Sequence, residues 1–149
     1  HRVRVILNII EYFRLKRCSL IVKLLIRFLE RSHGFFVAYN TSISKSVRFP
    51  HPVGIVLGDG VTIASGCKIY QNVTIGGARL GDALNRSYPS IGTDCVIYAG
   101  AIIVGNITIG NSTIIGANAV VINDVPDNHL AVGIPAKNIP LKNTNYDNS

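Results

Sequence analysis

Branched aliphatic residues recur every six positions through most of the chain. They stand at Leu57, Ile63, Ile69, Ile75, Ile91, Ile97, Ile103, Ile109, Ile115 and Val121. The residue after the aliphatic is often glycine or alanine, and the fifth residue of each six is small or branched, as at Val61, Cys67 and Val73. An α-helix cannot produce this period, because six residues overshoot its turn, and a flat strand does not need glycine at a fixed phase. The pattern therefore predicts a coil that turns a corner every six residues.

Each side of such a coil is a short strand, and three sides make one turn of about 18 residues. Glycine, asparagine and aspartate in "GDG", "GN" and "GAN" are expected at the corners, where unusual backbone dihedrals cost these residues little. Successive coils would pair through parallel ladders and bury the aliphatic side chains. The expected fold class is mainly β, a parallel β-helix of hexapeptide repeats.

Two interruptions break the period. The step from Phe49 to Leu57 is eight residues, and the step from Ile75 to Ile91 is sixteen, which leaves a ten-residue insertion. The insertion predicts a loop over residues 78–90, and a long loop on a rigid scaffold usually serves function.

The repeat extends back to Val37, so the chain is expected to have three parts. They are a basic helical segment (1–34), the β-helix (35–138) and a C-terminal tail (139–149). Within the first part, Ile6, Ile9, Ile10 and Phe13 follow helical spacing, and "CSLIVKLLIRFLERS" forms a second helix that Ser19 would cap and Gly34 would end. Its apolar run is too interrupted by charges to span a membrane, and no signal peptide is expected because a small-residue cleavage site is missing.

Positive charge is concentrated in this helical segment. Residues 1–33 hold eight basic and two acidic side chains, a net charge of +6, whereas the other 116 residues have a net charge of +1. Two interpretations stay open. The helices pack on the body or on a partner subunit with their cations in water, which is the commoner case, or they touch an anionic membrane surface peripherally. Nucleic acid is not an expected partner, because the cations alternate with aliphatics and lack an aromatic platform.

The cysteines and histidines show no ligand or disulfide spacing, so no metal is expected. An odd count of three cysteines favours a reduced, cytoplasmic protein, at the inner face of the membrane if the basic helices touch lipid. Cys67 and Cys95 are 28 residues apart, which is one coil once the ten-residue insertion is removed. They should therefore stack in adjacent coils as buried free thiols.

His51 stands at the first interruption, in "RFPHPVGIVLGDG". An imidazole titrates near neutral pH and suits a general base that takes a hydroxyl proton during acyl transfer. Pro50 and Pro52 would fix the chain around the ring, and a glycine-rich coil edge could supply backbone N–H groups to an oxyanion. The alternative is a histidine that hydrogen-bonds a carbonyl at a chain bend and has no catalytic role.

The segments "HPVGIVLG", "NVTIGG" and "VPDNHLAVGIPAK", in this order and with a loop after "IGG", resemble motifs of the hexapeptide-repeat acyltransferases. The likeness covers about residues 37–138 and is closest to serine acetyltransferases and to short sugar O-acetyltransferases of polysaccharide synthesis. It implies a left-handed parallel β-helix, acetyl-CoA as acyl donor, and a homotrimer with active sites between subunits. By this resemblance His51 matches the catalytic histidine, and coenzyme A would be met by Gly76, Gly77, Ala99, Ala117 and Lys137.

Three positions depart from the serine acetyltransferase motifs, one beside the histidine and two in the acceptor site. Phe36 replaces an acidic partner of the histidine, which then needs a backbone carbonyl or Asn40 to orient it, and Pro50 replaces an aspartate that holds the amino acid's ammonium. Tyr88 replaces a loop histidine, although Arg86 is kept. These differences favour the hydroxyl of a sugar or glycan, bound by Arg86 and Tyr88, as the acceptor. Serine, as in cysteine biosynthesis, is the alternative, and a non-catalytic structural β-helix is a third hypothesis.

Overall fold

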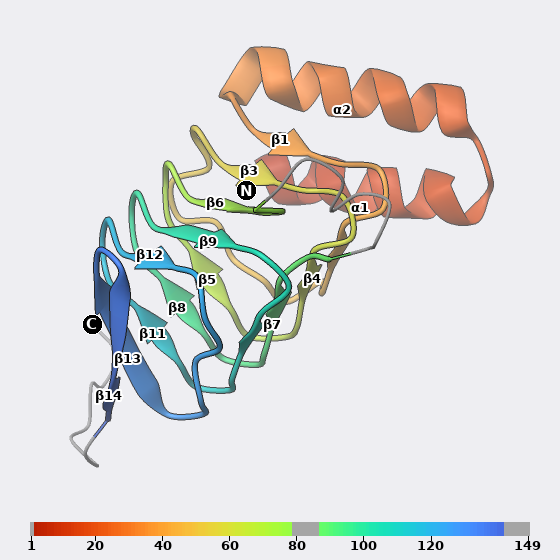
Figure 1. The fold of residues 1–149 in the computed structure, drawn as a ribbon. Helices are drawn as coiled ribbons and strands as arrows, with labels where there is room; N and C mark the ends of the chain where they lie inside the picture. The colour runs from red at the N-terminus through yellow and green to blue at the C-terminus, as the bar shows by residue number, and fades with distance from the viewer. Residues whose placement is uncertain (1, 79–86, 142–149) are drawn as a thin grey trace.

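The computed structural model describes residues 2–78 and 87–141, which fold into a parallel β-helix with two helices across one end (Figure 1). The coils follow one another in chain order, from the orange strand β1 beside the helices to the blue strands at the opposite end. The predicted fold class, mainly β with a parallel β-helix and a short N-terminal helical segment, is confirmed.

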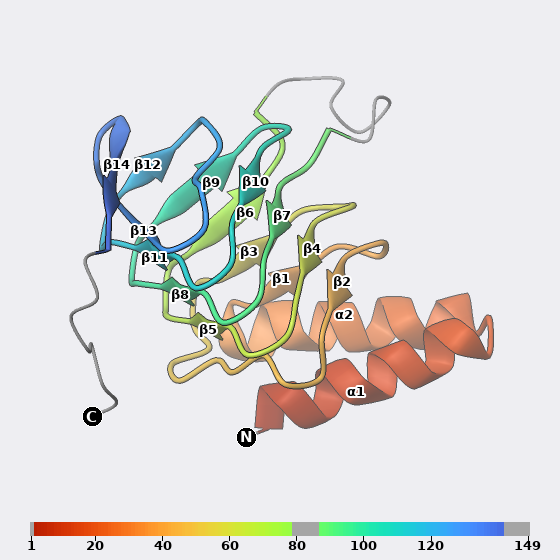
Figure 2. The same cartoon turned by 90° about the horizontal axis from the view of Figure 1, so that it is seen from below.

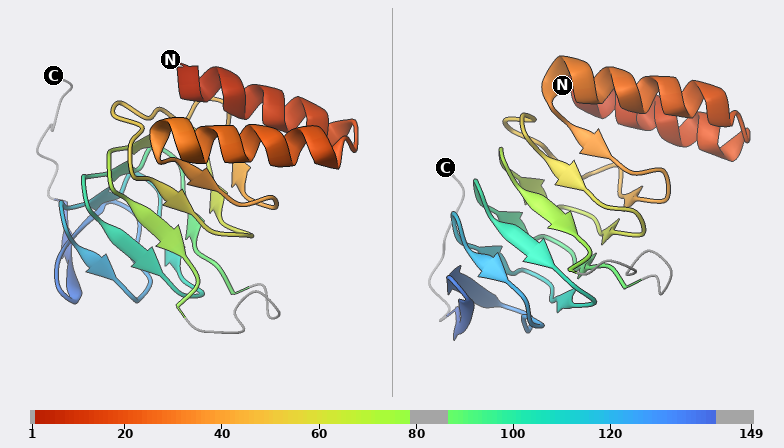
Figure 3. Two further views of the ribbon diagram at one scale, coloured as in Figure 1. Left: turned by 90° about the horizontal axis from the view of Figure 1, so that it is seen from above. Right: turned by 45° about the horizontal axis from the view of Figure 1, so that its top comes forward.

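Three sheets form the three sides of the coil (Figures 2 and 3). The first contains β1 (Phe36–Val37), β3 (Val56–Leu57), β6 (Thr74–Gly76), β9 (Ile102–Val104) and β12 (Val120–Val121). The second contains β2 (Ser42–Ile43), β4 (Thr62–Ile63), β7 (Ser90–Ile91) and β10 (Thr108–Ile109). The third contains β5 (Lys68–Ile69), β8 (Val96–Ile97), β11 (Ile114–Ile115), β13 (His129–Gly133) and β14 (Ala136–Pro140). Neighbouring strands are parallel except for the β13–β14 pair.

The repeat positions line the interior of the coil. All ten aliphatics of the six-residue series from Leu57 to Val121 are at most 3% exposed, and the residues of the fifth position are at most 9% exposed. Removing such a side chain from water contributes about 1.5–3 kcal/mol of hydrophobic free energy. The period predicted from the sequence is therefore the period of the core.

The corners use glycine for two different reasons. Left-handed backbone conformations, with φ between 52° and 77°, occur in columns at Gly54, Asn72, Gly100 and Asn118, and at Gly66, Asp94, Ser112 and Asn128. The glycines that follow the aliphatics Ile91 and Ile109, however, do not have positive φ. A Cβ added to Gly110 would lie 2.4 Å from the backbone nitrogen of Asp127. For these glycines the predicted dihedral reason is wrong, because they leave space for the neighbouring coil.

The helices α1 (Arg2–Leu15) and α2 (Ser19–His33) lie side by side across the N-terminal end of the β-helix (Figure 2). Gly34 has a φ of 57° and ends α2, as predicted. The predicted capping role of Ser19 is wrong, because Ser19 is the first helical residue and the preceding Cys18 makes no capping side-chain hydrogen bond. No helix among the described residues is long and apolar enough to cross a bilayer.

Two arginines attach α1 to the first coil. Arg14 donates hydrogen bonds to the carbonyl oxygens of Thr41 and Ala38, at 2.7 and 3.0 Å, and Arg4 donates to the carbonyl oxygen of Val47. One face of the helical layer thus packs on the β-helix. Contact with an anionic membrane surface, the second interpretation, could involve only the opposite face.

The C-terminal part closes the stack with a hairpin that the period does not predict. β13 pairs with β11 in parallel and with β14 antiparallel, with Leu130 beside Ile139. Most of the predicted 78–90 loop lies outside the described residues. The division of the chain into parts at residues 34 and 138 stays a prediction.

Cys67 and Cys95 are free, fully buried thiols in adjacent coils, where the Lys68 N–H donates to the Cys95 carbonyl oxygen. The predicted stacking is confirmed. A hydrogen bond with Cys67 and burial both raise the pKa of the Cys95 thiol, so it stays protonated at neutral pH.

Candidate active site

His51 lies at a corner between the third and the first sheet. A bridge pairs Arg48 with Lys68 of β5, so the residues before His51 extend the third side into an earlier coil. The eight-residue step to Leu57 gives this corner two more residues than a regular side, and the His51 side chain is exposed there. The Val53 N–H donates to the His51 carbonyl oxygen at 2.8 Å, which fixes a tight turn under the ring.

We call this corner, formed by residues 50–54, 70–72, 98–100 and 116–118, the histidine edge. Its coils are joined by backbone hydrogen bonds of 2.9–3.0 Å, which Asn72, Gly100 and Asn118 donate to the carbonyl oxygens of Val53, Gln71 and Ala99. These bonds place Ala99 and Ala117 in one column on the same edge as His51. Ala99 is half-buried and Ala117 is exposed.

Lys137 lies at the end of the same edge. It pairs with Val132 across the β13–β14 hairpin, and the position of a Cβ on Gly116, next to Ala117, is 2.6 Å from Cγ1 of Val132. The side chain of Lys137 is exposed. The structure therefore brings four of the predicted site residues, His51, Ala99, Ala117 and Lys137, onto one edge.

The other described site residues lie at the next corner, between the first and second sheets. We call this corner, formed by residues 58–60, 76–78, 104–106 and 122–124, the glycine edge. Gly76 accepts a hydrogen bond from the Gly105 N–H at 3.1 Å, and a Cβ added to Gly76 would meet nothing within 4 Å. The Tyr88 ring covers this edge, since a Cβ on Gly60 would lie 2.7 Å from its Cδ2. Gly77 is exposed, and Arg86 lies outside the described residues.

One chain does not bring the two edges together. Gln71 on the histidine edge and Gly76 on the glycine edge are joined by one extended side of the coil, five residues that span about 16 Å at ~3.3 Å per residue. His51 and the Tyr88 ring thus lie at opposite ends of the strands of the first sheet. Within a single chain, the seven described site residues form two half-sites.

None of the orienting groups expected for His51 is present among the described residues. The expected acidic position, Phe36, is a half-exposed residue of β1, and no described side chain or backbone group hydrogen-bonds the imidazole. Asn40 instead donates from its backbone N–H and its side chain to the Asp59 carboxylate, at 2.8 and 2.9 Å. The expectation that Asn40 or a carbonyl orients the ring is therefore wrong for this state of the chain.

The ring beside His51 belongs to a tyrosine that the sequence did not single out, and a second tyrosine stacks on it. The His51 and Tyr70 ring centroids are 6.2 Å apart at an interplanar angle of 48°, and Tyr70 stacks on Tyr98 at 5.3 Å and 20°. Tyr70 and Tyr98 are 28 residues apart, the spacing that predicts the stacking of Cys67 on Cys95. The same spacing could have found this column.

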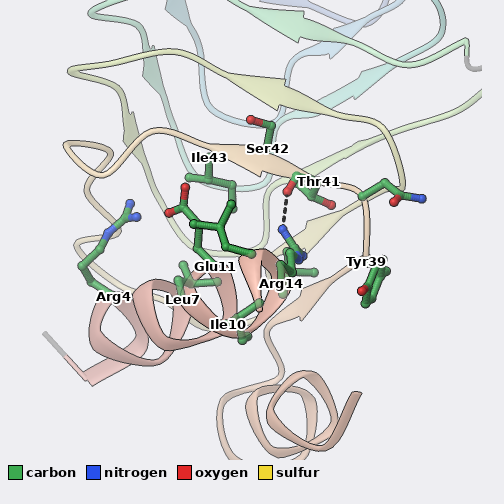
Figure 4. A pocket seen from close by; sticks show the side chains of 12 residues that line it. Arg4, Leu7, Ile10, Glu11, Arg14, Tyr39, Thr41, Ser42 and Ile43 are labelled. Atoms are coloured by element: carbon green, nitrogen blue, oxygen red, sulfur yellow. Dashed lines mark hydrogen bonds between the residues drawn. The ribbon is translucent and has the colours of Figure 1, made fainter. Parts of the chain in front are cut away.

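Two cavities lie away from the His51 ring. One, of about 380 Å³, opens between α1 and the first coil, and Figure 4 shows Arg4, Glu11 and Arg14 around it. Burial lowers the pKa of both arginines, and the Glu11 carboxylate partly opposes this. No described site residue lines this cavity. The other, of about 610 Å³, lies on the glycine edge, where Ala78, Ser87 and residues 104–107 and 122–124 line it. Over residues 2–78 and 87–141, no cluster of three His, Cys, Asp or Glu side chains could hold a metal ion.

Comparison with known proteins points to one group of enzymes. A serine acetyltransferase of Staphylococcus aureus is 39% identical over 71 residues, which are 48% of this chain and 32% of the relative. Serine acetyltransferase 5 of Arabidopsis thaliana is 41% identical over 62 residues, 42% of this chain and 19% of the relative. The chain thus spans about a third or less of the length of these relatives. No protein-family model matches it.

Solved serine acetyltransferases match the fold over most of this chain. A complex with CoA matches with a TM-score of 0.79 and 31% identity, over 89% of this chain and 53% of the other. The soybean enzyme complexed with serine has a TM-score of 0.78 and 33% identity, over 87% of this chain and 52% of the other.

These matches decide between the expectations drawn from the motifs. The predicted resemblance to the serine acetyltransferases, and with it the left-handed form of the β-helix, is confirmed. The prediction of a sugar or glycan acceptor in polysaccharide biosynthesis is wrong, because the relatives and the solved neighbours are serine acetyltransferases. It gave too much weight to Pro50 and Tyr88, two positions of an acceptor site, against the likeness of the whole coil.

Proposed function

From this likeness to the serine acetyltransferases, we propose that the protein is an acetyl-CoA-dependent serine O-acetyltransferase with His51 as general base. The observation that carries the proposal is the similarity, over 87–89% of the chain, to serine acetyltransferase structures with CoA or serine bound. The position of His51 supports it, because the ring is exposed at the one corner where the coil is widened ahead of β3. A proton acceptor in an acyl transfer must reach its substrate in this way.

In the proposed reaction, His51 accepts the proton of the serine hydroxyl while that oxygen bonds to the thioester carbonyl carbon. A tetrahedral oxyanion forms, and backbone N–H groups of the coil edge are suited to stabilise it. The C–S bond then breaks, and the leaving thiolate of coenzyme A takes the proton from the imidazolium. The products are O-acetylserine and coenzyme A, and the histidine is again neutral.

Acetyl-CoA is proposed to lie along the two half-sites. Ala99 and Ala117 have small side chains on the histidine edge, which lets a linear acyl carrier approach the backbone, and Gly76 and Gly77 do the same on the glycine edge. The exposed ammonium of Lys137 is suited to the phosphates that coenzyme A carries.

A homotrimer is part of the proposal. Since the half-sites of one chain are about 16 Å apart, a compact site needs the histidine edge of one copy beside the glycine edge of the next. A heterologous contact of this kind closes as a ring of three when each copy is rotated by a third of a turn from the last, as proposed here. Light scattering at micromolar concentration should give three times the chain mass, and a monomer would contradict this part of the proposal.

Serine also needs a carboxylate for its ammonium group, since Pro50 supplies none. We propose Asp59 of the glycine edge. It precedes Gly60, and a Cβ on Gly60 would lie 2.7 Å from Cδ2 of Tyr88. Asn40 already donates to both carboxylate oxygens, but a carboxylate offers about four lone-pair sites. Arg86 and Tyr88 are proposed to hold the serine carboxylate. Asp59→Asn should then raise the KM for serine with little effect on the KM for acetyl-CoA.

Release of free thiol from acetyl-CoA in the presence of L-serine tests the function. His51→Ala should lower kcat by about 10²–10⁴-fold and leave coenzyme A binding almost unchanged. The matched control is His129→Ala, because His129 begins β13, at the other end of the stack from His51, and its ring bonds the Asp127 carbonyl oxygen at 2.7 Å. Full activity in His51→Ala would leave His51 as a ring at a chain bend, and a wild-type chain that binds no acetyl-CoA would favour the structural β-helix.

We also propose that the outer face of α1 and α2 touches an anionic membrane surface from the cytoplasmic side. An exposed apolar stripe runs along α2, with 54–71% exposure at Leu20, Leu24 and Phe28. A parallel row of exposed cations borders it at Lys23, Arg27 and Arg31. If two copies met through this face, their cations would repel each other. An anionic lipid surface suits both features, because its acyl chains can cover the apolar stripe and its headgroups attract the row of cations.

A further inference from the structure

His51 lacks the partner that a general-base histidine usually has. Such a ring is held in one orientation by a hydrogen bond from its second nitrogen, and the same partner stabilises the imidazolium that forms during the reaction. In this chain the sequence position of that partner is Phe36, and no described group bonds the imidazole. An exposed, unrestrained ring would spend much of its time away from the productive geometry, and small displacements are costly in acyl transfer.

The tyrosine column supplies the missing restraint. The centroid distance of 6.2 Å between His51 and Tyr70 falls within the 4.5–7 Å range of favourable aromatic pairs. Tyr70 is half-buried and is held on its other side by Tyr98, whose ring is nearly parallel to it at 5.3 Å. Tyr70 and Tyr98 directly follow β5 and β8. These strands pair in register, so the backbone of two coils fixes the spacing of the two rings.

We propose that Tyr70 is the positioning residue of His51, and that its ring takes the place of the missing carboxylate. The inference rests on the proposed function of His51. The Tyr70 ring limits rotation of the imidazole, and its negative π-face favours the cation that His51 becomes when it holds the serine proton. Tyr98 acts only through Tyr70, because it lies one coil further along the edge.

The test compares Tyr70→Leu with Tyr70→Phe. Tyr70→Leu removes the ring and should lower kcat by about 3- to 10-fold, since an aromatic pair contributes about 0.5–1.5 kcal/mol, while the KM values for both substrates stay within about 2-fold. Tyr70→Phe keeps the ring and should restore at least half of the wild-type kcat. Equal losses in both variants would assign the effect to the hydroxyl and overturn the proposal, and so would full activity in Tyr70→Leu.

A readout without activity separates this inference from the proposed function. The imidazole C–H resonances of His51, identified by their disappearance in His51→Ala, should carry a ring-current shift that Tyr70→Leu removes and Tyr70→Phe keeps. If the wild-type chain acetylates nothing but these shifts behave as expected, the function is wrong and the positioning stands. Unchanged His51 resonances in Tyr70→Leu would overturn the positioning. Tyr12→Leu, on the exposed face of α1, is the control and should change neither kcat nor the resonances.

Discussion

The two helices and the β-helix they cover use apolar residues in opposite ways. In the coil, the aliphatics of the six-residue series are at most 3% exposed. In the helices, large apolar side chains face solvent, with exposures of 81% at Leu15 and 71% at Leu20. The helical segment also holds nearly all of the net positive charge, +6 in residues 1–33 against +1 in the rest.

This difference follows from how each structure repeats. A coil side places every second residue inside, and because the next coil covers the ladder, each inward side chain is enclosed above and below. A helix at the end of the stack has only one covered face, and α2 buries only Val22 and Leu29 there. Leu25 and Ile26 also pack partly against the core, whereas Leu20, Leu24 and Phe28 stay exposed on the opposite face. The coil therefore encloses its apolar residues on all sides, whereas the helical layer covers them on one side only.

The largest effect on stability is expected from side-chain truncation in the β-helix, and a matched truncation in α2 provides the comparison. Ile97→Ala in β8 should lower the free energy of unfolding by about 2–5 kcal/mol, because Ile97 is fully buried between coils and its removal leaves a cavity. Leu24→Ala in α2 should change it by less than about 0.5 kcal/mol, because Leu24 is 58% exposed. Urea unfolding followed by circular dichroism measures both. Similar losses for the two variants would mean that the helical face is covered within the folded protein.

Much of the fold could be predicted from the sequence because the coil is periodic. One buried residue fixes the phase of all the others, so the positions of Cys67 and Cys95, 28 residues apart, follow from counting. The terminal hairpin could not be predicted in this way, since β14 turns back antiparallel and leaves the period. The sequence also could not show why position 110 needs glycine. The space that a Cβ would take there is filled by the backbone of Asp127, which belongs to the next coil.

The candidate site was harder to predict because its parts belong to different corners. The motifs named His51, Ala99 and Gly76 together, but only the pairing of strands separates them onto two edges. The acceptor was misread for a related reason. A substitution such as Pro50 shows that one contact is missing, but it does not show which other carboxylate could replace it, and Asp59 is named for that role only as a proposal.

A smaller effect is expected when cations of α2 are neutralised and the binding of the protein to lipid vesicles is measured. Sedimentation with vesicles of phosphatidylcholine and phosphatidylglycerol should show binding that falls as salt rises. Lys23→Gln with Arg27→Gln should weaken it by about 10- to 30-fold, since each cation near an anionic surface contributes about 1 kcal/mol.

The matched control changes two cations of the β-helix, Lys45→Gln with Lys68→Gln, and should leave vesicle binding within about 2-fold. Equal binding to vesicles of phosphatidylcholine alone would contradict the electrostatic part of the proposal. Loss of binding together with a change in oligomeric state would assign the face to a second copy of the chain.

The smallest effect on stability is expected from substitution of a cysteine. The reactivity of the three thiols reports how well each region covers its side chains. Cys18 is half-exposed between α1 and α2, whereas Cys67 and Cys95 are enclosed in the coil, where Cys95 Sγ donates to the Gly110 carbonyl oxygen at 3.1 Å. Because the hydrogen bond with Cys67 and burial both raise the pKa of the Cys95 thiol, its reactive thiolate is scarce as well as covered. Iodoacetamide should therefore label one thiol per native chain, and none in Cys18→Ser, which should unfold within about 0.5 kcal/mol of wild type. In urea all three thiols should react. Labelling of Cys67 or Cys95 in the native protein, seen by peptide mass, would show that the coil opens and that the contrast between the two regions is one of degree.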